Sequence, residues 1–121
     1  MNNIFGIGID IEQIDRFKKL SYATHNAFLR RVYSAKELAY CFNKKNAAEH
    51  LAVRFAGKEA VMKALSGYVR PLDYQDIEIE RTPRAAPQVH VKKIQKKKMF
   101  IQISLSHTKD TAVAVAIVYG W

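Results

Sequence analysis

The segment from Asn46 to Ser66 is the longest element that the sequence predicts. It contains no proline, and apart from Gly57 every residue is compatible with a helix, which Gly67 could close as a C-cap. At about 100° of rotation per residue, its polar side chains separate into two narrow stripes, and nearly all other positions are apolar. We therefore expect a mostly buried helix whose charges open at two specific places. One stripe is His50, Arg54 and Lys58, and the other is Glu49, Glu59, Lys63 and Ser66.

A strand is predicted ahead of this helix. From Ile4 to Ile11, large apolar residues alternate with small or acidic ones, which is the period of a strand. Gly6, Gly8 and Asp10 share one face. A face without side chains lets another backbone or a ligand come close, and it leaves the carboxylate at its end projecting into that space. Taken alone, the pattern is more typical of tight packing than of a ligand site.

Helices and then strands follow along the chain. Helices are predicted from Glu12 to Leu20, from Asn26 to Val32, and from Ser34, whose spacing to Glu37 is that of a capping box, through Phe42. The last strand is apolar on both faces, as a central strand would be. The order of elements predicts one α+β domain spanning residues 1–121. The later strands are Ile77–Glu80, Val89–Val91, Phe100–Ser106 and Thr111–Tyr119.

The composition limits the class of protein. The chain has 121 residues and a formal charge of +9, which attracts nucleic acid, an acidic protein or a phosphate-rich small molecule. Its one cysteine, Cys41, cannot form an intrachain disulfide and is expected to be simply buried. There is no cationic start followed by an apolar core, and no apolar run of membrane-spanning length. We expect a soluble, cytoplasmic protein, and a domain this small often buries a face against identical copies.

A second polar group follows the strand Phe100–Ser106. Ser104, Ser106, His107, Thr108 and Lys109 crowd one turn, and each can donate a hydrogen bond to a phosphate oxygen. A lone loop histidine is more often a solvated bystander, and Glu59 with Lys63 at i and i+4 could be an ordinary surface ion pair. No single motif decides the function.

The joint pattern is more specific, because five blocks resemble, in order, the holo-acyl-carrier-protein synthases, the small bacterial class of phosphopantetheinyl transferases. The most specific block is similar to the family signature of phenylalanine, two small residues, Lys-Glu-Ala and then Lys-Ala. Two places depart from the family: Ser66–Tyr68 stands where Gly-Thr-Gly is common, and Ala85–Pro87 where Gly-Lys-Pro is. The blocks are Gly6–Phe17, Phe28–Leu38, Arg54–Ala64, Asp76–Ile79 and Ser104–Lys109.

The resemblance implies the 4′-phosphopantetheinyl transferase fold and a reaction of fatty acid biosynthesis. The enzyme would move 4′-phosphopantetheine from coenzyme A to a serine of apo acyl carrier protein, releasing adenosine 3′,5′-bisphosphate. Asp10, Glu59 and Lys63 would be catalytic, and Asp10 and Glu59 would hold one Mg²⁺ ion beside the diphosphate. Mg²⁺ is commonly fixed by one or two carboxylates plus substrate phosphates. A metal-bound water or Glu59 would accept the serine proton.

The resemblance also implies the remaining contacts. Lys63 would neutralise a diphosphate oxygen, and the candidates for binding coenzyme A phosphates are Arg54, Lys58, Lys63, Ser106, His107 and Thr108. The acidic carrier protein would dock on Arg16, Lys18, Lys19, Arg30 and Arg31. Members of the family are typically homotrimers with the active site where two subunits meet.

Two other readings compete with this one. The charge and the basic run Lys92–Lys98 could belong to a small nucleic-acid-binding module, but that run contains no interleaved aromatic residue. The second competing reading is a catalytically inactive relative that only binds coenzyme A or the carrier protein. Intact Asp10, Glu59 and Lys63 argue against it.

Overall fold

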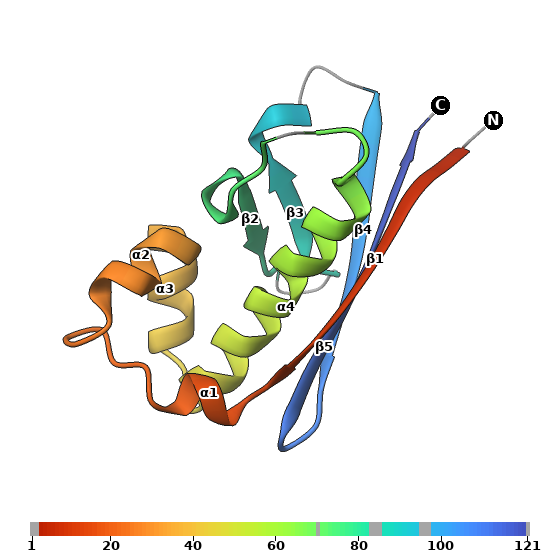
Figure 1. Ribbon diagram of the computed structural model, residues 1–121. Helices are drawn as coiled ribbons and strands as arrows, with labels where there is room; N and C mark the ends of the chain where they lie inside the picture. The colour runs from red at the N-terminus through yellow and green to blue at the C-terminus, as the bar shows by residue number, and fades with distance from the viewer. Residues whose placement is uncertain (1–2, 70, 83–85, 95–97, 121) are drawn as a thin grey trace.

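One helix, α4 (Ala47–Leu65), organises the computed structural model, which describes residues 3–69, 71–82, 86–94 and 98–120. It crosses one face of an antiparallel sheet whose strand order is β1-β5-β4 (Figure 1). The central strand β5 is the one predicted from its apolar run. The architecture is α+β, as the sequence predicted. The three strands are β1 (Asn3–Gln13), β4 (Met99–His107) and β5 (Thr111–Gly120).

Strand β1 and helix α4 are in backbone contact. A Cβ atom added to Gly6 would lie 2.0 Å from the carbonyl oxygen of Ala64, and one added to Gly8 would lie 1.9 Å from that of Ala60. Both distances are shorter than any real contact, so the helix can approach this closely only because the strand lacks side chains there. The prediction that the glycine face admits another backbone is confirmed.

Three short helices pack on the other side of α4 and form a second part of the core with it (Figure 1). Ser34 caps α3 through both hydrogen bonds of a capping box with Glu37, as predicted. The first helix is shorter than expected, because β1 continues to Gln13, which pairs with Thr111 of β5. Cys41 is fully buried, also as expected. The helices are α1 (Asp15–Lys18), α2 (Asn26–Val32) and α3 (Ala35–Phe42).

A two-stranded hairpin, β2 (Ile77–Glu80) and β3 (Gln88–Val91), packs against α4 beside β4. Gly57 of α4 faces it: an added Cβ would lie 2.6 Å from Cδ1 of Ile79, so the glycine makes room for the hairpin. Two short 3-10 helices flank the hairpin, η1 (Tyr74–Asp76) and η2 (Lys92–Ile94). Ala85, in one of the two places that depart from the family, and residues 95–97 of the basic run lie outside the described residues.

The outer face of the sheet differs from the inner one. Ile7, Ile9 and Ile11 of β1 alternate with the glycines and are 67%, 62% and 66% exposed. None of the described helices lies on this side (Figure 1). Among the described residues, no helix is long and apolar enough to cross a membrane.

Candidate active site

The carboxylate predicted at the end of the glycine face, Asp10, contacts Lys63 of α4. Asp10 is the next residue on the face of Gly6 and Gly8, and its side chain is only 12% exposed. Nζ of Lys63, from α4, donates to the carbonyl oxygen of Ile9 at 2.9 Å and to Oδ1 of Asp10 at 3.2 Å. Lys63 therefore binds the strand through both its backbone and its carboxylate.

The second oxygen of Asp10 is different. Oδ2 is buried and has no hydrogen-bond donor among the described residues. An unpaired buried carboxylate oxygen costs free energy, so such a group in a native fold points to a role that a bound cation would explain.

Glu59 of α4 is held by a residue outside the predicted set. The hydroxyl of Tyr74, in η1, donates a short hydrogen bond to Oε1 of Glu59. Burial, together with the hydrogen bond and charge of Glu59, raises the pKa of Tyr74. The hydroxyl therefore stays protonated and acts as a donor. The negative charges of Glu12 and Asp10 add to this rise.

Glu12 lies on the same face of β1 as Asp10, and it is the third acidic side chain of the site after Asp10 and Glu59. Burial and the neighbouring carboxylate of Asp10 raise the pKa of Glu12 to about 7, and Glu59 adds to the effect. Arg16 opposes it, because its Nη1 donates to Oε1 of Glu12 at 2.7 Å. The concentration of negative charge raises the affinity of the region for a cation.

This donor set fits Mg²⁺. The ion prefers carboxylate oxygens and keeps several waters, and Asp10 Oδ2 lacks a partner. Within the described ranges, no three or more His, Cys, Asp or Glu side chains are arranged to hold a metal. Asp10 and Glu59 could therefore supply two ligands, with substrate phosphates and water completing the shell.

Lys58, predicted to bind coenzyme A phosphates, lies in the interior instead. Its side chain is 0% exposed and its Nζ lies 2.7 Å from Oε1 of Glu37. The ammonium also donates to the carbonyl oxygens of Val32, Tyr74 and Ile77. All its donors are engaged, so it cannot reach a phosphate, and the structure contradicts this prediction.

The other cationic residues of that stripe line a small cavity of about 70 Å³, together with residues from the end of β4. Arg54 is 4% exposed, stacks on the ring of Tyr40 and leaves a buried Nε without an acceptor among the described residues. Burial and the charge of Arg54 lower the pKa of His50. The polar lining residues are Glu49, His50, Arg54, Arg81, Ser106 and His107.

His107 and Thr108, both predicted to bind coenzyme A phosphates, have different surroundings. Nε2 of His107 lies 4.0 Å from Oε2 of Glu49, while its Nδ1 donates to the carbonyl oxygen of Thr108. Oγ1 of Thr108 accepts from the backbone N–H groups of Asp110 and Thr111, so this oxygen shapes the turn between β4 and β5. Thr108 does not line the cavity, whereas Ser106 and His107 do.

The predicted docking residues all lie on the surface. Arg16, Lys18 and Lys19 are exposed around α1, and Arg30 and Arg31 are exposed at the end of α2. Lys18 pairs with Asp15 at 3.0 Å, and Arg16 pairs with the buried Glu12. The two helices therefore present separate groups of positive charge.

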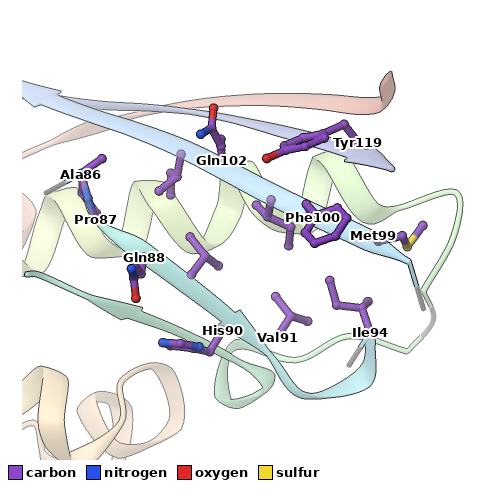
Figure 2. Close-up of a pocket in the computed structure, with 13 residues that line it drawn as sticks. Ala86, Pro87, Gln88, His90, Val91, Ile94, Met99, Phe100, Gln102 and Tyr119 are labelled. Carbon is purple, nitrogen blue, oxygen red and sulfur yellow. The ribbon is translucent and has the colours of Figure 1, made fainter. Parts of the chain in front are cut away.

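A larger hollow of about 680 Å³ lies between β3 and β4 (Figure 2). The side chains of Val91, Ile94 and Met99 project into it, and its lining contains no carboxylate. None of the predicted metal or coenzyme A residues lines this hollow, so we do not assign the chemistry to it.

Sequence reasoning missed three participants. Glu12 would have been found by extending the strand period by two residues. Glu37 was recognised as a capping residue but not as the partner of Lys58. Tyr74 gave no signal, because it lies in an irregular segment without periodicity.

The chain is similar to proteins of one family over nearly its whole length. The sequence profile of the 4′-phosphopantetheinyl transferase superfamily matches residues 6–118. The holo-[acyl-carrier-protein] synthase of Clostridium kluyveri is 42% identical over 120 residues, covering 94% of this chain and 89% of that protein.

Solved structures agree. The holo-(acyl-carrier-protein) synthase of Bacillus anthracis in complex with CoA (3′,5′-ADP) gives a TM-score of 0.81 at 30% identity, covering 98% of each chain. The Helicobacter pylori synthase in complex with coenzyme A gives 0.78 at 34% identity, covering 93% of this chain and 98% of the other. These likenesses give no support to a nucleic-acid-binding module.

Proposed function

The chain belongs to the 4′-phosphopantetheinyl transferase superfamily, and on this premise we propose a magnesium site at Asp10 and Glu59 for its reaction. The protein is an enzyme of the holo-[acyl-carrier-protein] synthase type. It transfers 4′-phosphopantetheine from coenzyme A to a serine of apo acyl carrier protein, a step that serves fatty acid biosynthesis. The observation that carries the metal proposal is the buried, unpartnered Oδ2 of Asp10.

The reaction needs positioning and charge stabilisation more than covalent chemistry by the protein. The serine oxygen forms a bond to the phosphorus attached to pantetheine, and the bond from that phosphorus to the bridging oxygen breaks. Adenosine 3′,5′-bisphosphate leaves with the bonding pair, and Glu59 or water accepts the proton of the serine hydroxyl. A bound Mg²⁺ supplies Lewis-acid stabilisation of the charge on the diphosphate oxygens. Lys63, 53% exposed beside Asp10, adds a second cationic group at the same place.

Coenzyme A phosphates also need partners away from the metal. We assign this to Arg54, Ser106 and His107, because they line one cavity and Arg54 has a buried Nε without an acceptor in the described part of the chain. A phosphate oxygen would satisfy that donor. Thr108 supports the group through its turn. Lys58 is left out.

The two sets of residues lie on different sides of α4. At about 100° of rotation per residue, the pair His50 and Arg54 lies about 180° around the helix axis from the pair Glu59 and Lys63. One coenzyme A molecule would be bound most simply by the first set from one copy and the second from another. This supports a homotrimer with active sites at subunit interfaces, and the exposed Ile7, Ile9 and Ile11 supply an apolar face for the contact.

The carrier protein is the acidic partner in this proposal. Arg16, Lys18, Lys19, Arg30 and Arg31 would attract it, because exposed groups of one charge speed the encounter with the opposite charge. We propose a cytoplasmic location, since coenzyme A and a carrier protein of fatty acid synthesis are the substrates.

The direct test is to mix the protein with apo carrier protein, coenzyme A and Mg²⁺ and to weigh the carrier by mass spectrometry. We expect the gain of one phosphopantetheine, its loss with a chelator, and a strongly reduced rate in Glu59→Ala. An unchanged carrier mass in the complete mixture contradicts the activity. Full activity with a chelator present contradicts the metal site alone.

A further inference from the structure

Tyr74 approaches Glu59 from outside α4. Its hydroxyl donates to Oε1, and its ring stacks on that of Phe55, one turn earlier on the helix, with centroids 5.5 Å apart and planes inclined by 29°. Ring and hydroxyl therefore contact the same stretch of α4. The hydrogen bond occupies one of the two carboxylate oxygens and fixes the plane of the carboxylate.

The backbone of Tyr74 is itself restrained. Its N–H donates to Oδ1 of Asp73, which begins η1 with a capping box, and its carbonyl oxygen accepts from the buried Nζ of Lys58 at 3.2 Å. The next residue, Gln75, donates from Nε2 to the carbonyl oxygens of Arg30 and Tyr33 at the end of α2. The position of the hydroxyl is thus set by contacts to α2 and α4 together.

Glu59 has an alternative partner on its own helix. Lys63 lies four residues further on, in the order that favours an ion pair. In the structure Lys63 instead contacts Asp10 and Ile9, while Tyr74 holds Glu59. Removal of the hydroxyl would free the carboxylate to rotate and to turn toward Lys63.

We infer that Tyr74 is a positioning residue, which fixes one oxygen of Glu59 so that the other faces the cation shared with Asp10. The inference rests on the proposed metal site. Groups that hydrogen-bond to a metal-ligating side chain orient it, and their loss commonly weakens metal binding by about 10-fold or more.

The test compares Tyr74→Phe with a matched variant, Tyr33→Phe. Each loses one hydroxyl and keeps its ring, and the hydroxyl of Tyr33 donates to the carbonyl oxygen of Leu51 in the core and not to a carboxylate. Mn²⁺ is titrated into each protein with coenzyme A present and no carrier protein, and free Mn²⁺ is read by electron paramagnetic resonance. A titration of coenzyme A without protein serves as the blank.

We expect Tyr74→Phe to bind Mn²⁺ about 10-fold more weakly than the unaltered protein, and Tyr33→Phe to bind it equally well. In turnover, Tyr74→Phe should raise the Mg²⁺ concentration needed for half-maximal rate while keeping most of kcat at saturating Mg²⁺. A purely structural loss would lower kcat without moving that concentration.

Equal Mn²⁺ affinity in Tyr74→Phe and the unaltered protein overturns the inference and leaves the metal site standing. Absence of Mn²⁺ binding by the unaltered protein overturns both. If Tyr74→Phe does not fold, as judged by circular dichroism, an NMR experiment on the unaltered protein still tests the inference. The hydroxyl proton of Tyr74 should shift in its NMR spectrum on Mg²⁺ addition, and an unmoved signal speaks against the role.

Discussion

The ammonium of Lys58 lies 2.7 Å from a carboxylate oxygen of Glu37, and both side chains are shut off from water. Burial lowers the pKa of Lys58, and the charge of Glu37 opposes this effect. The carboxylate of Glu37 also accepts hydrogen bonds from the backbone N–H groups of Ser34 and Ile79. The pair thus ties α3, α4 and β2 together beneath the site.

Lys58→Met should therefore destabilise the fold strongly. It leaves the carboxylate of Glu37 buried without its counter-charge, which commonly costs about 3–5 kcal/mol. The free energy of unfolding from urea titration measures the loss. Removing both charges, with Glu37→Gln added, should recover part of the stability, because no lone charge then remains. Strictly additive losses in the double variant would contradict the pairing.

Gly8→Ala should damage both stability and activity. The added methyl group would lie 1.9 Å from the carbonyl oxygen of Ala60, so α4 must move away from β1 at a cost of about 3 kcal/mol or more. Thermal unfolding and turnover report the two effects. Gly67→Ala is the matched control, because an added methyl group meets nothing within 4 Å there. It should leave stability unchanged or raise it by about 0.4–1 kcal/mol.

Cys41 should be unreactive in the folded protein. Burial raises the pKa of its thiol to about 11, so the thiolate, which is the reactive form, is scarce at pH 8. A chromogenic disulfide reagent should label it slowly in buffer and quickly in guanidinium chloride. Because the folded pKa is the higher one, this thiol favours folding below about pH 9, and its contribution is lost as the pH rises toward 11. Rapid labelling of the native protein would refute this account.

Arg31→Glu should weaken the use of carrier protein without affecting coenzyme A. Loss of electrostatic steering lowers the association rate by about 10-fold or more, so kcat/KM for the carrier should fall and depend less on salt. The KM for coenzyme A should stay the same. Lys92→Glu makes the same charge change on an exposed residue of η2 and should have a much smaller effect. Equal losses in the two variants would show that only net charge matters.

Local patterns sufficed for most of the fold. The helix at 26–32 and the strand at 77–80 begin and end where periodicity and turn residues put them. The first helix was drawn too long, because the extension of β1 depends on Thr111, about a hundred residues away, and not on local propensity. Pairing across the chain is information that a local pattern does not contain.

The site was predictable in unequal parts. Asp10 and Lys63 could be placed on a face of a strand and a stripe of a helix, and the structure brings them into contact. Lys58 looked equivalent to Arg54 by helical period, yet its partner Glu37 comes from another helix and takes it into the core. Tyr74 shows the same limit, since tertiary contacts alone bring its hydroxyl to Glu59.

The interlocked glycines of β1 have an evolutionary consequence. Because peptide backbone touches peptide backbone at Gly6 and Gly8, the separation of strand and helix next to Asp10 does not depend on the size of any packed side chain. Core residues elsewhere can vary while that spacing persists. The glycines cannot be exchanged one at a time, so lineages that keep the chemistry should keep them too.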